Sequence, residues 1–160
     1  MASPSRKALI TAGTAVGALA TLGVIILAAA TSRTPDIGSA PHAGHPACTD
    51  IAKRYPSRLM GKNREDTGAP GVAVWGDSTV VLRCGMTPPR PTTAPCFTIS
   101  GVDWVLTDGT AEDGSKTLIT YGRDPAVEVT VAGGLPSAGD SLVDLGNAVR
   151  EIPQKSECVS

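Results

Sequence analysis

Aromatic residues are scarce in this chain: its 160 residues include two Trp, two Tyr and one Phe. Basic charge is not in excess either, since the formal net charge is -1. Three of the 14 basic residues (Arg6, Lys7 and Arg33) precede Thr34, which leaves 11 basic against 15 acidic residues in the rest. Nucleic-acid binding depends on stacking and on basic contacts to phosphate, so no nucleic-acid partner is expected.

Recognised catalytic signatures are also missing. The sequence contains no G-x-S-x-G elbow, no phosphate-binding loop and no H-E-x-x-H. The only histidines, His42 and His45, form an H-x-x-H pair in a segment rich in Pro and Gly, without the further ligands that a zinc site needs. They are expected to be solvent-exposed, so neither a metal nor a cofactor is predicted.

Charge is absent from residues 8–30, a run of 23 residues. As a helix this run spans about 34 Å, enough for one crossing of a hydrocarbon core of about 30 Å. The sequence therefore predicts a cytoplasmic tail at 1–7, a transmembrane signal anchor at 8–30 and a flexible linker at 31–47. A cleavable signal peptide is the alternative, because Ala28 and Ala30 form an A-x-A-like site. Either way, residues 48–160 are expected to form a domain outside the cytoplasm.

All four cysteines follow the apolar run, as in the disulfide framework of an exported domain. Four cysteines allow three pairings. We expect Cys84–Cys96, which closes the proline-rich loop, and Cys48–Cys158, which ties the ends of the domain together. A redox pair is usually spaced C-x-x-C, whereas eleven residues separate Cys84 from Cys96.

The pattern of apolar residues predicts a small two-layer α+β domain with a mostly antiparallel sheet of four or five strands and helices on one face. Thr49 is the expected N-cap of a short helix that Pro56 ends. A later helix begins near Ser137 or Asp140 and stops at Pro153. The expected strands are a hairpin of 72–75 and 79–84, then 97–99 and 102–106 as one bent strand or two paired ones, and 116–121 with 126–131.

Between these strands, residues 107–115 are expected to form a loop. The alternation of Val127, Val129 and Val131 points one face of its strand inward, which places Glu128 and Thr130 outward. Trp75 is expected in the core.

Acidic residues are the remaining catalytic candidates. Asp103 is the least ordinary, because it lies within an apolar strand. A hydrolase would use paired carboxylates such as Asp103 and Asp124, and Asp103 would share a cleft with at least one other acid. In a binding module the acids would be scattered or used in turns. The full set is Asp77, Asp103, Asp108, Asp113, Asp124 and Glu128.

Several runs, WGDSTVVLRCG, GVDW and YGRDPAVEV, together with the apolar N-terminal segment, resemble actinobacterial membrane proteins grouped as domain-of-unknown-function family 3515. The resemblance covers about residues 48–149 and carries over no catalytic residue. It implies an exported or single-pass envelope protein. Its pattern includes Arg83, Asp103, Trp104 and Arg123, which we take as a candidate surface site.

These observations favour a non-catalytic binding or accessory module with an envelope-protein or cell-wall partner over the hydrolase. A structural subunit of a membrane complex is a third possibility, because Gly13 and Gly17 have G-x-x-x-G spacing in the apolar run.

Overall fold

The computed structural model describes residues 37–134 and 138–158. The predicted tail, the predicted transmembrane helix and the first part of the predicted linker lie outside this range. Neither helix in the described ranges combines the length and the apolar character that a membrane crossing requires. The elements are α1 (Pro46–Ala52), β1 (Arg58–Leu59), β2 (Lys62–Glu65), β3 (Val72–Trp75), β4 (Val80–Met86), β5 (Cys96–Ile99), β6 (Val102–Thr110), β7 (Lys116–Thr120), β8 (Ala126–Val131) and α2 (Ala138–Val149).

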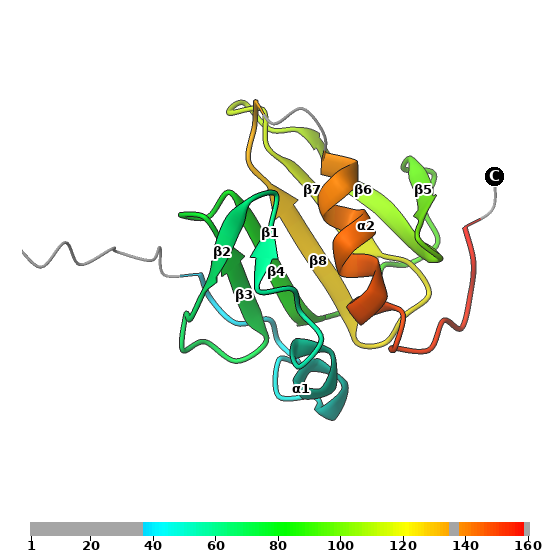
Figure 1. Cartoon of the computed structure of the whole chain (residues 1–160). Helices are drawn as coiled ribbons and strands as arrows, with labels where there is room; N and C mark the ends of the chain where they lie inside the picture. The colour runs from blue at the N-terminus through cyan, green and yellow to red at the C-terminus, as the bar shows by residue number, and fades with distance from the viewer. Residues whose placement is uncertain (1–36, 135–137, 159–160) are drawn as a thin grey trace, which may run out of the picture. The chain divides into compact units, whose positions relative to one another are not determined.

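The strands form one antiparallel sheet in the order β1-β2-β3-β4-β8-β7-β6-β5 (Figure 1). The chain leaves β4 in the middle of the sheet through the proline-rich segment 87–95 and enters β5 at the far edge. It then returns strand by strand until β8 pairs with β4. The α+β class is confirmed, and the sheet is wider than predicted, with eight strands.

Two local features account for the additional strands, and a third makes β6 longer than predicted. The short strands β1 and β2 are largely exposed and polar, so they lack the apolar alternation that reveals a half-buried strand. Segments 96–99 and 102–110 are two paired strands, joined by Ser100 and Gly101, which both have positive φ. Residues 107–110, expected in a loop, instead continue β6. The predicted hairpin of β3 and β4 is confirmed.

Both helices lie against the same face of the sheet. Trp75, Leu82, Val129 and Trp104 project from four strands into a core that they share with residues of α1 and α2. Figure 1 shows α2 lying across the sheet. The predicted range of the second helix is confirmed within a few residues, and Trp75 is fully buried as expected.

The first helix starts earlier than predicted. Pro46 occupies the first turn, and the Nδ1 atom of His45 accepts a hydrogen bond from the Ala47 N–H at 3.1 Å. The prediction of Thr49 as N-cap was therefore wrong, because Pro at the first helical position and a capping side chain before it fix the start. The preceding residues are also packed, since the His42 N–H donates to the Gly85 carbonyl at 2.8 Å and Ala43 is buried.

The four cysteines form two disulfides, but not in the expected pairing. Cys48 bonds to Cys84 and Cys96 bonds to Cys158. Cys84 lies on β4 and Cys96 on β5, with β8, β7 and β6 between them. Four strand spacings amount to about 19 Å, and the Cα atoms of a disulfide must lie within about 7 Å. The disulfide framework is confirmed and the predicted pairing is wrong.

The sheet face opposite the helices is also covered. Val105, Ile119 and Ala126 form a second, smaller apolar cluster there, against which Ala94 of the proline-rich segment packs. Glu128 lies on this face, as predicted, but it is only 9% exposed. Because this face is covered as well, Glu128 is nearly buried although it was expected to lie in solvent.

Candidate functional site

Asp103 lies on the second face of the sheet, where it holds the C-terminal segment. Its Oδ1 accepts a hydrogen bond from Thr98 Oγ1 at 2.6 Å on the neighbouring strand. Its Oδ2 accepts from Gln154 Nε2 at 2.8 Å and from the Cys158 N–H at 2.9 Å. Burial alone would raise the pKa of Asp103, but these three hydrogen bonds and the charge of Arg123 outweigh burial and hold it below its ordinary value.

Arg123 secures the same segment from the turn between β7 and β8. Its Nη1 donates to the carbonyl of Ile152, just beyond the end of α2, and its Nη2 donates to Gln154 Oε1 at 2.9 Å. A second bond from Nη2 reaches the Gly101 carbonyl at 3.1 Å. Arg123 as a whole is 3% exposed, so it acts as a buried cap for backbone carbonyls.

The four residues of the predicted surface site do not gather at the surface. Trp104 is fully buried in the helix-side core, and Asp103 and Arg123 are almost completely buried. Arg83 binds Glu128 on the adjacent strand, with Nε donating to Oε1 at 2.9 Å. Each polar member of this set thus contacts other parts of the chain, and their role in binding stays a prediction.

The acids predicted for a hydrolase are not paired as proposed. Asp124 is exposed and contacts Lys155 at 3.4 Å. Asp103 instead shares an open hollow of about 310 Å³ with Glu157 of the C-terminal segment. We call this space the C-terminal hollow; Thr98, Gly101, Gln154 and Cys158 complete its lining.

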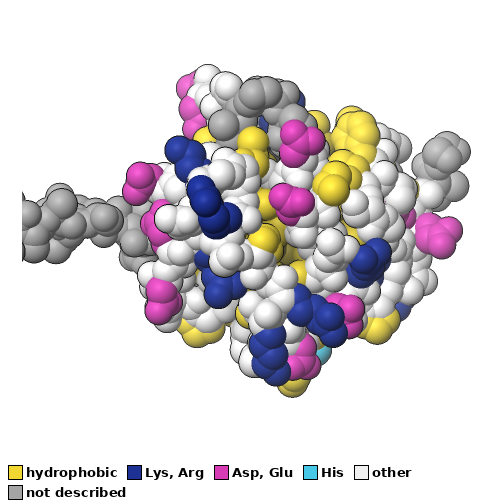
Figure 2. All heavy atoms as spheres, in the orientation of Figure 1, with side chains coloured by type: hydrophobic (Ala, Val, Ile, Leu, Met, Phe, Trp, Pro, Cys, Tyr) yellow, Lys and Arg dark blue, Asp and Glu magenta, His cyan; other side chains and the backbone are white. Residues whose placement is uncertain are grey.

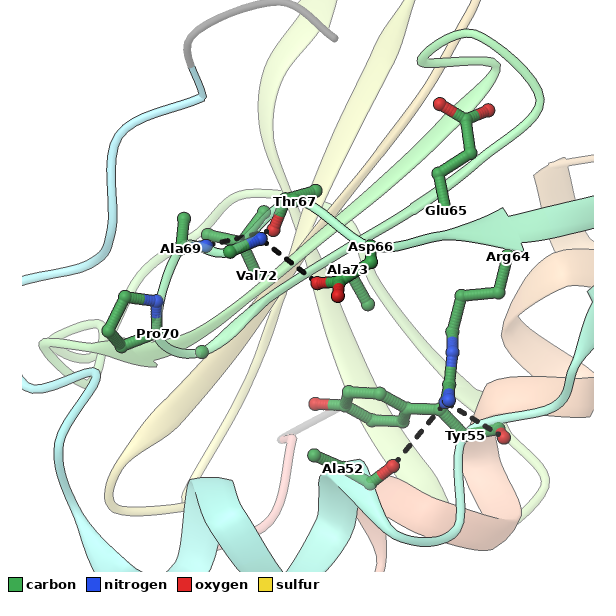
Figure 3. A pocket seen from close by; sticks show the side chains of 12 residues that line it. Ala52, Tyr55, Arg64, Glu65, Asp66, Thr67, Ala69, Pro70, Val72 and Ala73 are labelled. Carbon is green, nitrogen blue, oxygen red and sulfur yellow. Dashed lines mark hydrogen bonds between the residues drawn. The ribbon is translucent and has the colours of Figure 1, made fainter.

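A larger hollow than this one lies between α1 and the loop that joins β2 to β3. Its volume is about 580 Å³, and we call it the β2–β3 hollow (Figure 3). Tyr55 extends along it, and Arg64 lies at one side, where Nη1 donates to the Tyr55 carbonyl at 3.3 Å. The lining consists of Ala52, Tyr55, Arg64, Glu65, Asp66, Thr67, Gly68, Ala69, Pro70, Gly71, Val72 and Ala73.

Sequence reasoning missed this hollow. In the sequence, Tyr55 is one apolar residue next to Pro56, and Arg64 is one of several basic residues in the stretch that follows. The run Asp66–Gly71 signals a turn by composition, which is the one local clue. The hollow itself depends on where α1 packs, and that is a tertiary fact.

Charged side chains of both signs lie on the face of the molecule that Figure 2 presents, with Lys and Arg interspersed with Asp and Glu. No group of three or more His, Cys, Asp or Glu residues within the described ranges is arranged to hold a metal ion. His45 serves as a helix cap.

Fold and site together define a disulfide-stabilised α+β domain whose most unusual acid, Asp103, is engaged in structural hydrogen bonds. The family model described as protein of unknown function (DUF3515) matches residues 10–157. The chain therefore belongs to this family. No curated protein and no solved structure matches the chain.

Proposed function

We propose that this protein is a single-pass, membrane-anchored protein of the cell envelope, whose domain lies outside the cytoplasm and acts as a non-catalytic binding or accessory module. The observation that supports this best is that all four cysteines are used in two disulfides. Such bonds persist in oxidising compartments outside the cytoplasm. The charge-free run 8–30 would supply the anchor.

Mass mapping without reduction, on protein recovered from membranes, tests this proposal. We expect linked peptides for Cys48–Cys84 and Cys96–Cys158, together with an N-terminal peptide that begins at Met1 or Ala2. A Cys158→Ser variant is the control, because it leaves Cys96 as a thiol that alkylation must detect. Free thiols in the unsubstituted protein, or its recovery in the cytosol, would contradict the proposal.

The state of Asp103 does not suit the general acid of a hydrolase. A general acid must hold a proton near the operating pH, which requires a raised pKa. The pKa of Asp103 is lowered, because three donors and Arg123 together outweigh the effect of burial. Both of its oxygens are also occupied by hydrogen bonds within the chain.

A hydrolase remains the second candidate because Asp103 and Glu157 line one hollow. Assays with chromogenic aryl glycosides distinguish the two. Turnover that is lost in Glu157→Gln and kept in Lys155→Gln would favour the hydrolase, whereas no turnover is expected from a module. The third candidate, a subunit of a membrane complex, rests on Gly13 and Gly17, which lie outside the described residues.

A further inference from the structure

The hydroxyl of Tyr55 has no hydrogen-bond partner among the described residues, although it is buried. The side chain is 8% exposed, and its ring packs edge-to-face on Trp75 with a centroid distance of 6.1 Å. Figure 3 shows the hydroxyl pointing away from Arg64, toward the side of the β2–β3 hollow formed by the loop before β3. Buried polar groups in native proteins are nearly always paired, so a ligand that offers an acceptor to this hydroxyl would be stabilised by it.

Asp66 offers a complementary group in the same hollow. Its Oδ1 accepts the Gly68 N–H at 3.0 Å, which leaves Oδ2 available to accept from a ligand. The neighbouring loop amides are not available to an anion, because the Ala69 N–H donates to Thr67 Oγ1 at 3.2 Å. Two acids and one arginine line the hollow, so its charge also disfavours anions.

The two groups together restrict the chemistry of the ligand. The Tyr55 proton needs an acceptor, while the Asp66 carboxylate needs a donor. An ammonium group can only donate, so it cannot accept the Tyr55 proton, whereas a hydroxyl both donates and accepts. Small apolar side chains such as Ala52 and Val72 also line the hollow, where they can contact the C–H groups of a sugar ring.

We propose that the β2–β3 hollow binds a neutral, polyhydroxylated ligand of the saccharide class, with Tyr55 donating to one of its oxygens and Asp66 accepting from one of its hydroxyls. This inference rests on the proposed function as a binding module and names the ligand class of that module. The Tyr55 hydroxyl is closed to solvent, so the proposal requires that residues 67–70, in the loop before β3, shift when the ligand binds. The hydrogen bonds of that stretch at Gly68 and Ala69 are local, so it can move without breaking the sheet.

The experiment uses the full chain in a detergent without a sugar headgroup. Saturation-transfer NMR is recorded with cellotetraose, the N-acetylglucosamine tetramer, N-acetyl-tetra-alanine amide and inorganic phosphate. Amide hydrogen exchange is followed in parallel by mass spectrometry. We expect binding of at least one saccharide, with changed exchange confined to peptides that cover residues 66–73.

Tyr55→Phe is the decisive variant, because it removes only the hydroxyl. We expect the dissociation constant to rise roughly tenfold or more, the loss of about one hydrogen bond, while the melting temperature stays the same or rises. If Tyr55 were purely structural, Tyr55→Phe would lower the melting temperature and leave the dissociation constant unchanged. Tyr121→Phe, at a different hollow, is the matched control and should change affinity less than about twofold.

Binding of the peptide or phosphate alone would overturn the saccharide inference, as would saccharide binding that Tyr55→Phe leaves intact. No binding of any probe would also overturn it. None of these results bears on the membrane location or on the cysteine mapping, so failure here is distinguishable from failure of the proposed function.

Discussion

Asp103 shows how one residue can tie a chain end to a sheet. It is buried, and its three hydrogen-bond donors come from β5 and from two positions in the C-terminal segment. A carboxylate that accepts several such bonds prefers to stay ionised, which is why its pKa is lowered.

Replacing Asp103 by Asn should cost about 2–3 kcal/mol of unfolding free energy at pH 7, since charge-assisted hydrogen bonds become neutral or are lost. The folded pKa lies below the ordinary value of 3.8, so the stabilisation is fully present above 3.8 and disappears as the pH falls through the folded value. The unfolding free energies of the two proteins should therefore converge at low pH. Urea unfolding of both proteins between pH 7 and pH 2 measures this. Asp144→Asn, on the exposed side of α2, should show almost no difference at any pH. A difference in unfolding free energy between Asp103→Asn and the unsubstituted protein that stays constant with pH would contradict a stabilising role of the ionised carboxylate.

Gly122 lies close to the backbone of Ser156, and it can do so because it lacks a side chain. Its φ is +70°, and a Cβ there would lie 1.9 Å from the Ser156 carbonyl oxygen. Gly61 has a similar φ of +75° but no atom within 4 Å of the same position. We expect Gly61→Ala to cost about 1 kcal/mol from backbone strain and Gly122→Ala about 1–3 kcal/mol more from the clash. Equal losses in chemical denaturation would show that Ser156 moves aside freely.

At the scale of elements, the two disulfides differ in their access to solvent. Cys48 and Cys84 are 2% and 0% exposed, so α1 and β4 shield their bond. Cys96 and Cys158 are half-buried and line an open hollow of about 360 Å³ under the proline-rich segment. Thiol–disulfide exchange requires access for the attacking thiolate.

Graded reduction should therefore open Cys96–Cys158 well before Cys48–Cys84. Timed alkylation followed by mass spectrometry measures the order. The bonds join residues 62 and 36 positions apart, so the chain-entropy model assigns each about 4 kcal/mol, and any difference in rate reflects access more than stability. Simultaneous labelling of all four cysteines would instead indicate global unfolding before reduction.

Elements with strong local signals could be predicted from the sequence. The hairpin of β3 and β4 has β-branched runs around a Gly-containing turn, and α2 has an apolar stripe before a proline. The strands β1 and β2 carry no such alternation, and the start of α1 depends on His45 and Pro46 acting together. Asp103 could be singled out as an acid in an apolar strand. Its partner Gln154, and the hollow beside Tyr55, could not.

At the scale of the whole molecule, local sequence patterns do not encode which strands and which cysteines pair over long distances in the chain. The chain pairs β4 with β8, whose partners are 40 positions apart for Met86 and Ala126 and 51 positions apart for Val80 and Val131, and it places β5 at the far edge. The expected Cys84–Cys96 bond assumed that neighbours in sequence stay neighbours in space. The crossing through residues 87–95 removes that proximity, and the disulfide pairing follows the sheet order rather than the sequence order.

The same topology predicts a single cooperative unfolding unit. Trp75 on β3 and Trp104 on β6 lie on opposite sides of the central β4–β8 pair, yet both belong to one apolar core with α2. Neither half of the sheet can lose this core alone, so the two halves should unfold together. In Trp75→Phe and in Trp104→Phe, the remaining tryptophan reports one half of the sheet. We expect its fluorescence transition in urea to coincide with the far-UV circular dichroism transition of the same variant. A fluorescence midpoint that precedes the dichroism midpoint in either protein would show that one half opens first.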